Sequence, residues 1–241
     1  MENPIYISLS RQTALQRQME MVANNIANMN TTAYKNQRML FQEYVDRPAI
    51  GEKISLVQDY NTTRELREGP IQATNNPLDV ALQGDGYFTV ETMSGPRYTR
   101  AGHFRLNNDS ELVDGNGLPV MGENDLRLQI PQNARTIDIK GDGTIIADNV
   151  QVGRIKVVRF EREQFMKETA GGLYVTDEQP LDAPDTKMAQ GMLEQSNVQP
   201  VLEMTSMIEI MRQYQSNQKM MEAEHERQRT AISKLGRVSQ A

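Results

Sequence analysis

The sequence contains no cysteine, no tryptophan and only two histidines among its 241 residues. Without cysteine, the chain has no disulfide framework, no thiolate nucleophile and no iron or zinc held by thiolates. His103 and His225 alone do not supply the sites of two or three histidines that bind transition metals. We therefore expect neither a metal ion nor a cofactor.

Positive charge is also in short supply, because 26 lysines and arginines stand against 32 aspartates and glutamates. A protein that binds nucleic acid normally presents a basic surface to the phosphates, so we expect no nucleic-acid partner. Apolar and aromatic residues are few as well, at 38% and 5%. This shortage indicates that part of the chain buries its apolar surface against other chains.

Long apolar runs are absent, since the longest, such as Met39–Phe41, has three residues. A helix that spans a bilayer needs about 20 apolar residues, so we expect no membrane insertion. The N-terminal sequence has no basic residue before Arg11 and no apolar core, unlike a cleaved signal peptide. We expect the protein, if it leaves the cytoplasm, to be exported without such a signal.

Glycine divides the chain into three parts, with one glycine in residues 1–60, thirteen in 61–186 and two in 187–241. The middle part also holds most of the negative charge, with 13 basic and 20 acidic side chains. Glycine-rich sequence with short apolar runs is typical of strands and turns, and glycine-poor sequence rich in Met, Gln, Glu and Leu is typical of helices. The sequence thus predicts a mainly β central domain between two helical ends.

Both ends repeat apolar residues at alternating spacings of three and four, the a/d pattern of a coiled coil. A helix over 201–235 is about 50 Å long, which exceeds the diameter of a small β domain. The alternative is that both helices pack on the chain's own core, but the glutamines and many methionines of the stripe favour contacts with other subunits. The predicted subunit-interface seam consists of Leu15, Met19, Val22, Ile26, Met204, Met207, Met211, Tyr214, Met221, Ile232 and Leu235.

In the middle part, short runs of β-forming residues alternate with turns rich in glycine and asparagine. Two runs, 79–82 and 87–90, lie on either side of a glycine turn, and six more follow between residues 111 and 176. Regular spacing of short strands predicts a small sandwich or barrel-like domain. Pro180 and Pro184 indicate an extended linker into the last helix.

No group of residues indicates catalysis. The turns at 107–111 and 114–117 resemble pieces of calcium loops, but no stretch has the complete ligand spacing. The glycine pairs at 84–86 and 141–143 are too short for phosphate loops, and the nucleophile elbow and zinc-protease motifs are missing. Catalysis by paired carboxylates has no support in the sequence, although abundant Asp and Glu do not exclude it. We predict a protein that is not an enzyme.

Four segments, in order along the chain, resemble shared motifs of the bacterial flagellar rod, hook and hook-associated axial proteins. They are VANNIANMNTTAYK (22–35), NPLDVALQGDGYF (76–88), YTRAGHF (98–104) and GMLEQSNV (191–198). The resemblance covers nearly the whole chain. It implies a structural subunit that assembles helically into the drive shaft that transmits torque for motility.

The resemblance also implies the roles of the segments, with the two terminal helices paired as an inner coiled coil. Residues 1–34 are then an axial helix and hinge, 35–75 a connecting extended segment, 76–186 a β-rich outer domain, and 187–241 a linker and long axial helix. The implied hinge residues are Asn24, Asn25, Asn28, Thr31, Tyr34 and Lys35. The implied β-domain motif residues are Asn76, Pro77, Leu78, Asp79, Gly84, Gly86, Arg100 and Gly102.

Partners and location follow from the same resemblance. The partners are other copies of the chain, other proximal and distal rod proteins, and the flagellar type III export apparatus, and the location is the basal-body rod that crosses the periplasm. The segment 197–208 and the modest length favour a proximal rod subunit. The alternatives are a distal rod subunit of the same family, or a β domain that binds carbohydrate or acts on peptidoglycan.

One residue departs from the family pattern, because Ala33 stands where many members have glycine. A left-handed backbone at this position costs an alanine roughly 1 kcal/mol or more. We therefore expect the turn after the first helix to differ from that of the family.

Overall fold

The computed structural model describes residues 3–46, 54–131 and 134–238 of the chain. The chain divides into two compact units, which are described separately. The first contains residues from Met1–Ala27, Gln37–Arg64 and Gln199–Ala241, and the second contains Asn28–Asn36 and Glu65–Val198.

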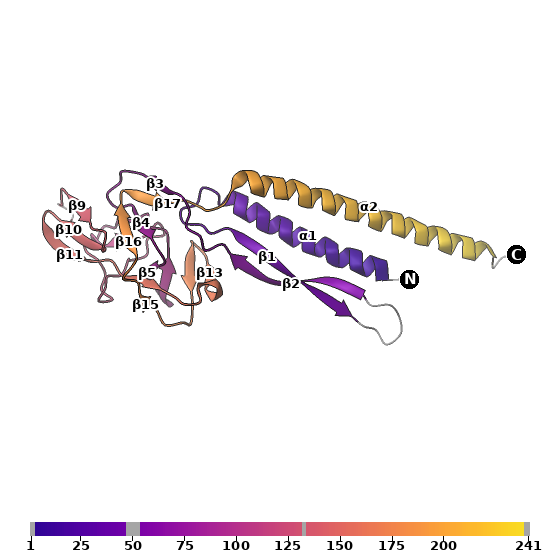
Figure 1. Cartoon of the computed structure of the whole chain (residues 1–241), viewed down its shortest axis with the longest axis horizontal. Helices are drawn as coiled ribbons and strands as arrows, with labels where there is room; N and C mark the ends of the chain where they lie inside the picture. Colours follow the sequence, from indigo (N-terminus) through magenta and orange to yellow (C-terminus); the bar gives the residue numbers. More distant parts are fainter. Residues whose placement is uncertain (1–2, 47–53, 132–133, 239–241) are drawn as a thin grey trace. The chain divides into compact units, whose positions relative to one another are not determined.

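The first unit consists of two helices and one β-hairpin within the described residues. They are α1 (Asn3–Ala27), β1 (Gln37–Asp46), β2 (Ile54–Arg64) and α2 (Pro200–Val238). The helices lie side by side, and the antiparallel β1–β2 hairpin runs along α1 (Figure 1). Pro200 fits the first turn of α2, because N–H groups in a first turn have no acceptor within the helix and the missing N–H of proline is not needed there. The negative charge of Glu203 in the same turn interacts favourably with the helix dipole. Both predicted helices are confirmed, whereas the sequence predicts only an extended connection where the hairpin lies.

The second unit is mainly β, as predicted. Its strands are β3 (Ile71–Ala73), β4 (Val80–Gln83), β5 (Tyr87–Thr92), β6 (Gly95–Thr99), β7 (Arg105–Leu106), β8 (Leu112–Val113), β9 (Ile137–Ile139), β10 (Thr144–Ala147), β11 (Val150–Arg154), β12 (Val157–Arg159), β13 (Lys167–Thr169), β14 (Leu173–Val175), β15 (Leu181–Asp182), β16 (Lys187–Gln190) and β17 (Met192–Glu194), with a 3₁₀ turn, η1 (Glu163–Phe165). Within the described residues, the largest sheet has the order β13-β14-β6-β5-β12-β15. A smaller sheet has the order β11-β10-β9, and the pairs β16–β4, β17–β3 and β7–β8 complete the unit.

Strands β4 and β5 follow the two predicted runs, but they do not pair with each other. β4 pairs with β16, and β5 pairs with β6 and β12. Both strands are buried along most of their length, so each needs neighbours from later parts of the chain. The segment that the sequence predicts as a linker supplies β16, and it also supplies β17, which pairs with β3.

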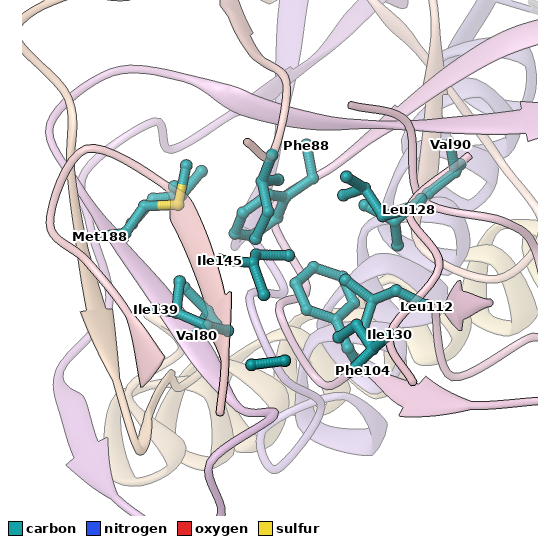
Figure 2. Packing of buried hydrophobic residues seen from close by; sticks show 14 of the residues in the cluster. Val80, Phe88, Val90, Phe104, Leu112, Leu128, Ile130, Ile139, Ile145 and Met188 are labelled. Atoms are coloured by element: carbon teal, nitrogen blue, oxygen red, sulfur yellow. The ribbon is translucent and has the colours of Figure 1, made fainter. Parts of the chain in front are cut away.

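The main core of the second unit is a cluster of aliphatic side chains around the edge-to-face pair of Phe88 and Phe104, whose ring centroids are 5.0 Å apart (Figure 2). A second cluster is aromatic and surrounds Phe160, which packs against Tyr98 and Tyr87 at centroid distances of 4.7 and 6.1 Å. The two clusters occupy opposite faces of β5, because successive side chains of a strand alternate and Tyr87 and Phe88 join different clusters.

Candidate subunit interface and motif residues

The contact between α1 and α2 is a small apolar cluster. Leu15 and Val22 from α1 are buried against Ile210 from α2, at 6%, 8% and 4% exposure. Four more predicted seam residues are partly buried around them, namely Met19, Ile26, Met207 and Tyr214. The cluster is therefore the side of α2 that faces its own chain.

Polar residues lie at both ends of this apolar cluster. At one end, the Asn25 amide nitrogen donates to the Gln37 carbonyl at 2.9 Å and to Glu203 at 3.3 Å. At the other end, the Asn217 amide nitrogen donates to the Ser8 carbonyl at 2.8 Å. These contacts show that the two helices run antiparallel.

A second apolar stripe lies on the exposed side of α2. Val201, Met204, Ile208 and Met211 follow one another at spacings of three, four and three, and their exposures are 75%, 49%, 52% and 45%. One face of a helix repeats at this period, so the four side chains form a stripe about 15 Å long. Of the remaining predicted seam residues, Met221 is half-buried and Ile232 is exposed, while Leu235 lies outside the described side chains.

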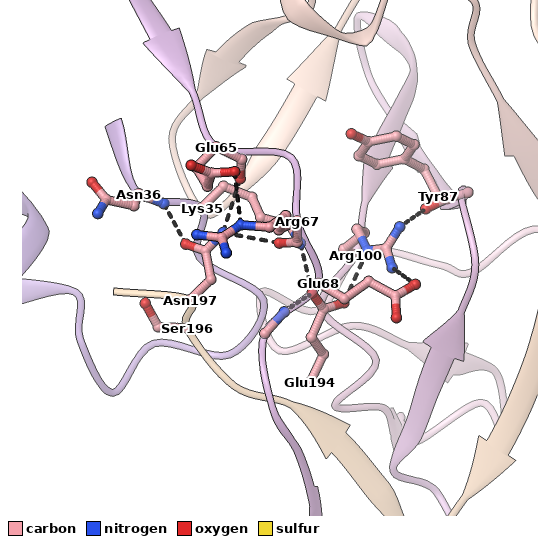
Figure 3. A network of polar contacts seen from close by, with 12 residues as sticks. Lys35, Asn36, Glu65, Arg67, Glu68, Tyr87, Arg100, Glu194, Ser196 and Asn197 are labelled. Atoms are coloured by element: carbon pink, nitrogen blue, oxygen red, sulfur yellow. Dashed lines mark hydrogen bonds and ion pairs between the residues drawn. The ribbon is translucent and has the colours of Figure 1, made fainter. Parts of the chain in front are cut away.

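Among the described residues of the second unit, the most buried charged residue is Glu194, whose side chain is 1% exposed (Figure 3). One of its oxygens accepts from the Lys35 ammonium at 2.7 Å and from the Gly69 N–H at 3.0 Å, and the other accepts from Arg100 Nε at 2.9 Å. Arg100 also donates to Glu68 at 3.2 Å. Each buried charge thus has an opposite charge and further hydrogen bonds, which burial requires.

This network shifts the pKa values of its members. Burial alone raises the pKa of Glu194, but Arg100, Lys35 and the Gly69 N–H outweigh it and hold that pKa below its ordinary value. Burial lowers the pKa of Lys35, and Glu194 offsets this only in part. Burial also lowers the pKa of Arg100, but here Glu194 outweighs it, so the net shift is upward. The carboxylate is therefore ionised and held by two cations, an arrangement suited to fixing chain segments.

Asn197 continues the network toward the segment that follows α1. Its amide oxygen accepts from the Asn36 N–H at 2.7 Å, and its amide nitrogen donates to the carbonyls of Glu65 and Arg67, both at 2.9 Å. The Ala33 N–H donates to the Glu194 carbonyl at 2.8 Å. Residues 33–36, 65–69 and 194–197, far apart in sequence, are thereby tied together.

Of the other predicted hinge residues, Asn24 lies near the end of α1, and Asn28, Thr31 and Tyr34 lie in the segment that follows it. Asn28 accepts from the Thr31 hydroxyl at 3.1 Å, Tyr34 is buried, and Asn24 is exposed. Ala33 has a left-handed backbone with φ 57°, a geometry that suits glycine. The hydrogen bond from its N–H and its burial hold the alanine in this conformation despite the steric cost.

The β-domain motif residues support the turns around β4. The Asp79 carboxylate accepts from the Thr74 hydroxyl at 2.7 Å and the Asn76 amide at 3.0 Å, and its other close contact is His103 Nδ1 at 2.7 Å. Gly102 has to be glycine, because a Cβ there would lie 1.7 Å from the Val80 carbonyl oxygen.

The remaining members of the motif surround the same turns. Leu78 packs partly against the core and Pro77 is exposed, with its carbonyl accepting from Gln190. Gly84 donates its N–H to Glu68 at 2.6 Å, and the Gly86 carbonyl accepts from Arg100 at 3.2 Å.

Sequence reasoning missed Glu194 as the centre of the network, and it missed Ile210 and Asn217 in the helix pair. Glu194 lies within the motif 191–198, so the resemblance points to this position. Nothing in the sequence indicates that its side chain is buried. In α2, apolar residues at 204, 207, 208, 210, 211 and 214 fit two heptad phases, and only the partner helix selects the phase containing Ile210.

No group of three or more His, Cys, Asp or Glu side chains among the described residues is placed to hold a metal ion. Within the same part of the chain, neither helix has the length and apolar character needed to cross a membrane. What the described residues do present is a helix pair, an exposed apolar stripe and a buried polar network.

Comparison with known proteins identifies the class. Three family models match along the chain: "Flagella basal body rod protein" over residues 5–35, "Flagellar hook protein FlgE/F/G D1 domain" over 81–147, and "Flagellar basal body rod FlgEFG protein C-terminal" over 189–234. These models define a bacterial flagellar axial protein, a structural subunit and not an enzyme.

Full-length relatives narrow the class. The chain is 36% identical to the flagellar basal-body rod protein FlgF of Caulobacter vibrioides, over 99% of this chain and 100% of that protein. It is 32% identical to FlgF of Mesorhizobium japonicum over 99% and 100%, and 30% identical to FlgG of Bacillus subtilis over 90% and 92%. The chain belongs to the flagellar basal-body rod protein family.

Proposed function

We propose that this chain is a subunit of the proximal rod, which assembles helically with other copies of itself and with other rod proteins into a shaft that transmits torque. The observation that carries the proposal is the exposed stripe of Val201, Met204, Ile208 and Met211 on α2. Contiguous exposed apolar surface of this kind marks sites of protein association.

The stripe is separate from the contact that α2 makes with its own chain. A helix that packs only within its own chain needs one apolar face, and the face of Ile210 already serves α1. Covering the stripe with a neighbouring helix contributes about 25 cal/mol per Å² of apolar surface removed from water. In this proposal the stripe of one subunit contacts a different surface of its neighbour. Contacts between two different surfaces propagate along a helical assembly, whereas a surface that contacts its own copy closes into a dimer.

We further propose that α1 and α2 pair as a coiled coil. The spacing of Leu15, Met19, Val22 and Ile26 supports this, as does the heptad phase of Met207, Ile210 and Tyr214. In this proposal Met204 and Met211 contact neighbouring subunits, and Met221, Ile232 and Leu235 extend the contact toward the end of α2.

The motif residues that follow α1 belong to the second unit and form a mechanical joint in this proposal. α1 ends at Ala27, and Lys35 is fixed by the buried carboxylate of Glu194. Force applied along the chain at residue 35 is then borne by ion pairs and hydrogen bonds as well as by the backbone. The β-domain motif residues keep the turns around β4 in the geometry that this joint needs.

We propose that the chain reaches the rod in the periplasm through the flagellar type III export apparatus. Membership of the rod family supports this route. The absence of cysteine supports it too, because no disulfide has to form or be reduced as the chain moves between compartments.

Met211→Asp tests the proposed function, with Ser216→Asp at an exposed position of the same helix that lies off the stripe as its control. We expect Met211→Asp to stop swimming and to be missing from isolated basal bodies, because it places a charge in the stripe. The purified variant should melt at the temperature of the wild type, since the side chain is half exposed. Normal swimming and normal incorporation of Met211→Asp would contradict the assignment of the stripe.

A further inference from the structure

The segment that follows α1 carries the only lysine that is buried among the described residues. Lys35 is 4% exposed, and Ala33 and Tyr34 beside it are 6% and 8% exposed. The Lys35 ammonium donates to the Glu194 carboxylate at 2.7 Å and to the Arg67 carbonyl at 2.8 Å. A buried ammonium group is tolerated only where an opposite charge and hydrogen-bond acceptors surround it. These three residues therefore fill a site that the rest of the second unit provides.

The site that receives Lys35 is assembled from other parts of the second unit. The Glu194 oxygen that accepts from Lys35 also accepts from the Gly69 N–H at 3.0 Å. The guanidinium of Arg100 holds the other oxygen of Glu194 at 2.9 Å and donates to Glu68 at 3.2 Å (Figure 3). Without Lys35, two carboxylates face one guanidinium, so the site has an excess of one negative charge. It is thus suited to bind one cation, and Lys35 supplies it.

Backbone contacts reinforce this ion pair. The Ala33 N–H donates to the Glu194 carbonyl at 2.8 Å, and the Asn197 N–H donates to the Tyr34 carbonyl at 3.3 Å. The Asn197 amide oxygen accepts from the Asn36 N–H at 2.7 Å. All of these residues belong to the second unit, whereas α1 and α2 belong to the first. These contacts therefore do not require the helices to be paired.

We propose that residues 28–36, the docking segment, are held on the rest of the second unit in the unassembled chain, whether or not α1 and α2 are paired, and that Lys35 is the residue that holds them. α1 ends at Ala27, immediately before this segment, and α2 begins at Pro200, three residues after Asn197. Asn197 is hydrogen-bonded to the docking segment. The docked segment therefore keeps the adjoining ends of both helices within a few residues of one point.

This docking gives the pairing of the helices a starting point, and this step rests on the proposed function. Two segments that leave one point pair at a high effective concentration, because the loop that closes between them is short. Their nearest contacts are those of the Asn25 amide nitrogen with the Gln37 carbonyl and with Glu203, at 2.9 and 3.3 Å. Pairing then proceeds toward the bond of Asn217 with Ser8 at the far end. As a subunit joins the rod, its helices become ordered outward from the docking segment.

Lysine acetylation in the full-length chain tests the proposal, because a buried amine reacts only when the segment that carries it opens. The purified chain, diluted until it is monomeric, is treated with the N-hydroxysuccinimide ester of acetic acid, and mass spectrometry follows each lysine. Lys140 and Lys167 are exposed and serve as internal references. We expect Lys35 to react at least about 100-fold more slowly than these two lysines.

Two variants should open the docking segment. Asn197→Ala removes the hydrogen bonds of the side-chain amide and leaves every charge in place, and we expect it to speed the acetylation of Lys35 at least about tenfold. Glu194→Gln removes the counter-ion and should speed it further. Asn30→Ala, at an exposed position of the same segment, is the matched control and should leave the rate unchanged. Near-ultraviolet circular dichroism of the buried tyrosines verifies that the second unit stays folded, and Asn197→Ala alone decides the test if Glu194→Gln fails to fold.

Ile210→Asp places a charge in the apolar contact between α1 and α2, and Lys35 should stay protected in this variant. Rapid acetylation of Lys35 in the wild type or in Ile210→Asp would overturn the proposal, as would slow acetylation in both Asn197→Ala and Glu194→Gln. The assay uses the unassembled chain, so its result does not depend on the rod. If Lys35 reacts rapidly while Met211→Asp abolishes swimming, the docking proposal fails and the proposed function stands. If Lys35 is protected as expected while Met211→Asp swims normally, the proposed function of the stripe fails and the docking stands.

Discussion

At the scale of single residues, the strongest interactions centre on Glu194. Its side chain is 1% exposed, and those of Lys35 and Arg100 are both 4% exposed, so three charges are held away from water. Taking such charges out of water is costly, and the pairing compensates only while all partners are present. The network therefore makes the packing of residues 33–36 against the rest of the second unit sensitive to the loss of a single charge.

Glu194→Gln removes the negative charge and keeps the shape of the side chain. We expect the variant to lose about 3–5 kcal/mol of unfolding free energy at neutral pH, because Lys35 and Arg100 remain buried without their counter-ion. Urea denaturation of the purified chain measures the change. Glu91→Gln is the control, since the Glu91 and Arg127 side chains of its ion pair are 44% and 50% exposed, so the pair should contribute little to stability. Equal effects of the two substitutions would contradict the role of burial.

The lowered pKa of Glu194 predicts how stability depends on pH. Below the ordinary pKa of about 4.5, the unfolded chain binds a proton at this position while the folded chain resists it. The contribution of Glu194 is therefore present above about pH 4.5 and is lost as the pH falls through the lowered pKa of the folded state. The Glu194→Gln protein should show a smaller loss of stability over this acidic range. Parallel curves for the two proteins would show that Glu194 is not shifted.

Ala33 is a second residue whose backbone conformation affects the free energy of unfolding. A left-handed conformation costs an L-residue roughly 1–2 kcal/mol, and glycine loses about 0.5–1 kcal/mol of entropy on folding. Ala33→Gly should therefore raise the unfolding free energy by up to about 1 kcal/mol. Ala23→Gly, at an exposed position within α1, should lower it by about 1 kcal/mol. A decrease in both variants would mean that the alanine is not strained.

At the scale of elements, α2 has two apolar faces with different tasks. Ile210 is 4% exposed and contacts α1, while its neighbour Met211 is 45% exposed on the stripe. Adjacent residues of a helix point about 100° apart, which is why one chain position separates the two faces. The division allows one face to be altered while the other stays intact.

The pair Ile210→Ala and Met211→Ala tests this division. Ile210→Ala should destabilise the helix pair by about 2–5 kcal/mol through the cavity it leaves. Met211→Ala should change stability by no more than about 0.5 kcal/mol, as is usual for exposed positions. Hydrogen exchange in α1 measures both effects, and it should accelerate only in Ile210→Ala. Faster exchange in Met211→Ala would place Met211 in the internal contact.

Element type was predictable from sequence because it depends on local pattern. The glycine distribution separated the helical ends from the β region, and the runs at 144–147 and 173–176 lie on β10 and β14. Which strands, helices and charged groups contact one another was not predictable, because these contacts depend on residues far apart in the chain. The pairing of β4 with β16, the phase of α2 that contains Ile210 and the burial of Glu194 all arise only when distant segments meet.

At the scale of the whole molecule, the fold leaves the apolar stripe of α2 exposed, where neighbouring subunits can cover it. Its low apolar content agrees with this, since part of the burial that a globular protein completes alone is left to assembly. The acidic second unit has its own two cores and its own polar network, so its folding does not require the stripe on α2. Family membership places such a subunit in the flagellar rod.

This chain is a component of the flagellar rod, and its localisation in isolated basal bodies is the most direct test of that assignment. A short epitope tag is inserted in the turn between β5 and β6, where Met93 is fully exposed. The tagged gene replaces the natural copy in a motile strain, and labelled basal bodies are imaged by electron microscopy. In the tagged strain we expect label on the rod. In a strain that lacks the gene we expect no structures distal to the rod. Label away from the rod, or intact flagella in the deletion strain, would contradict it.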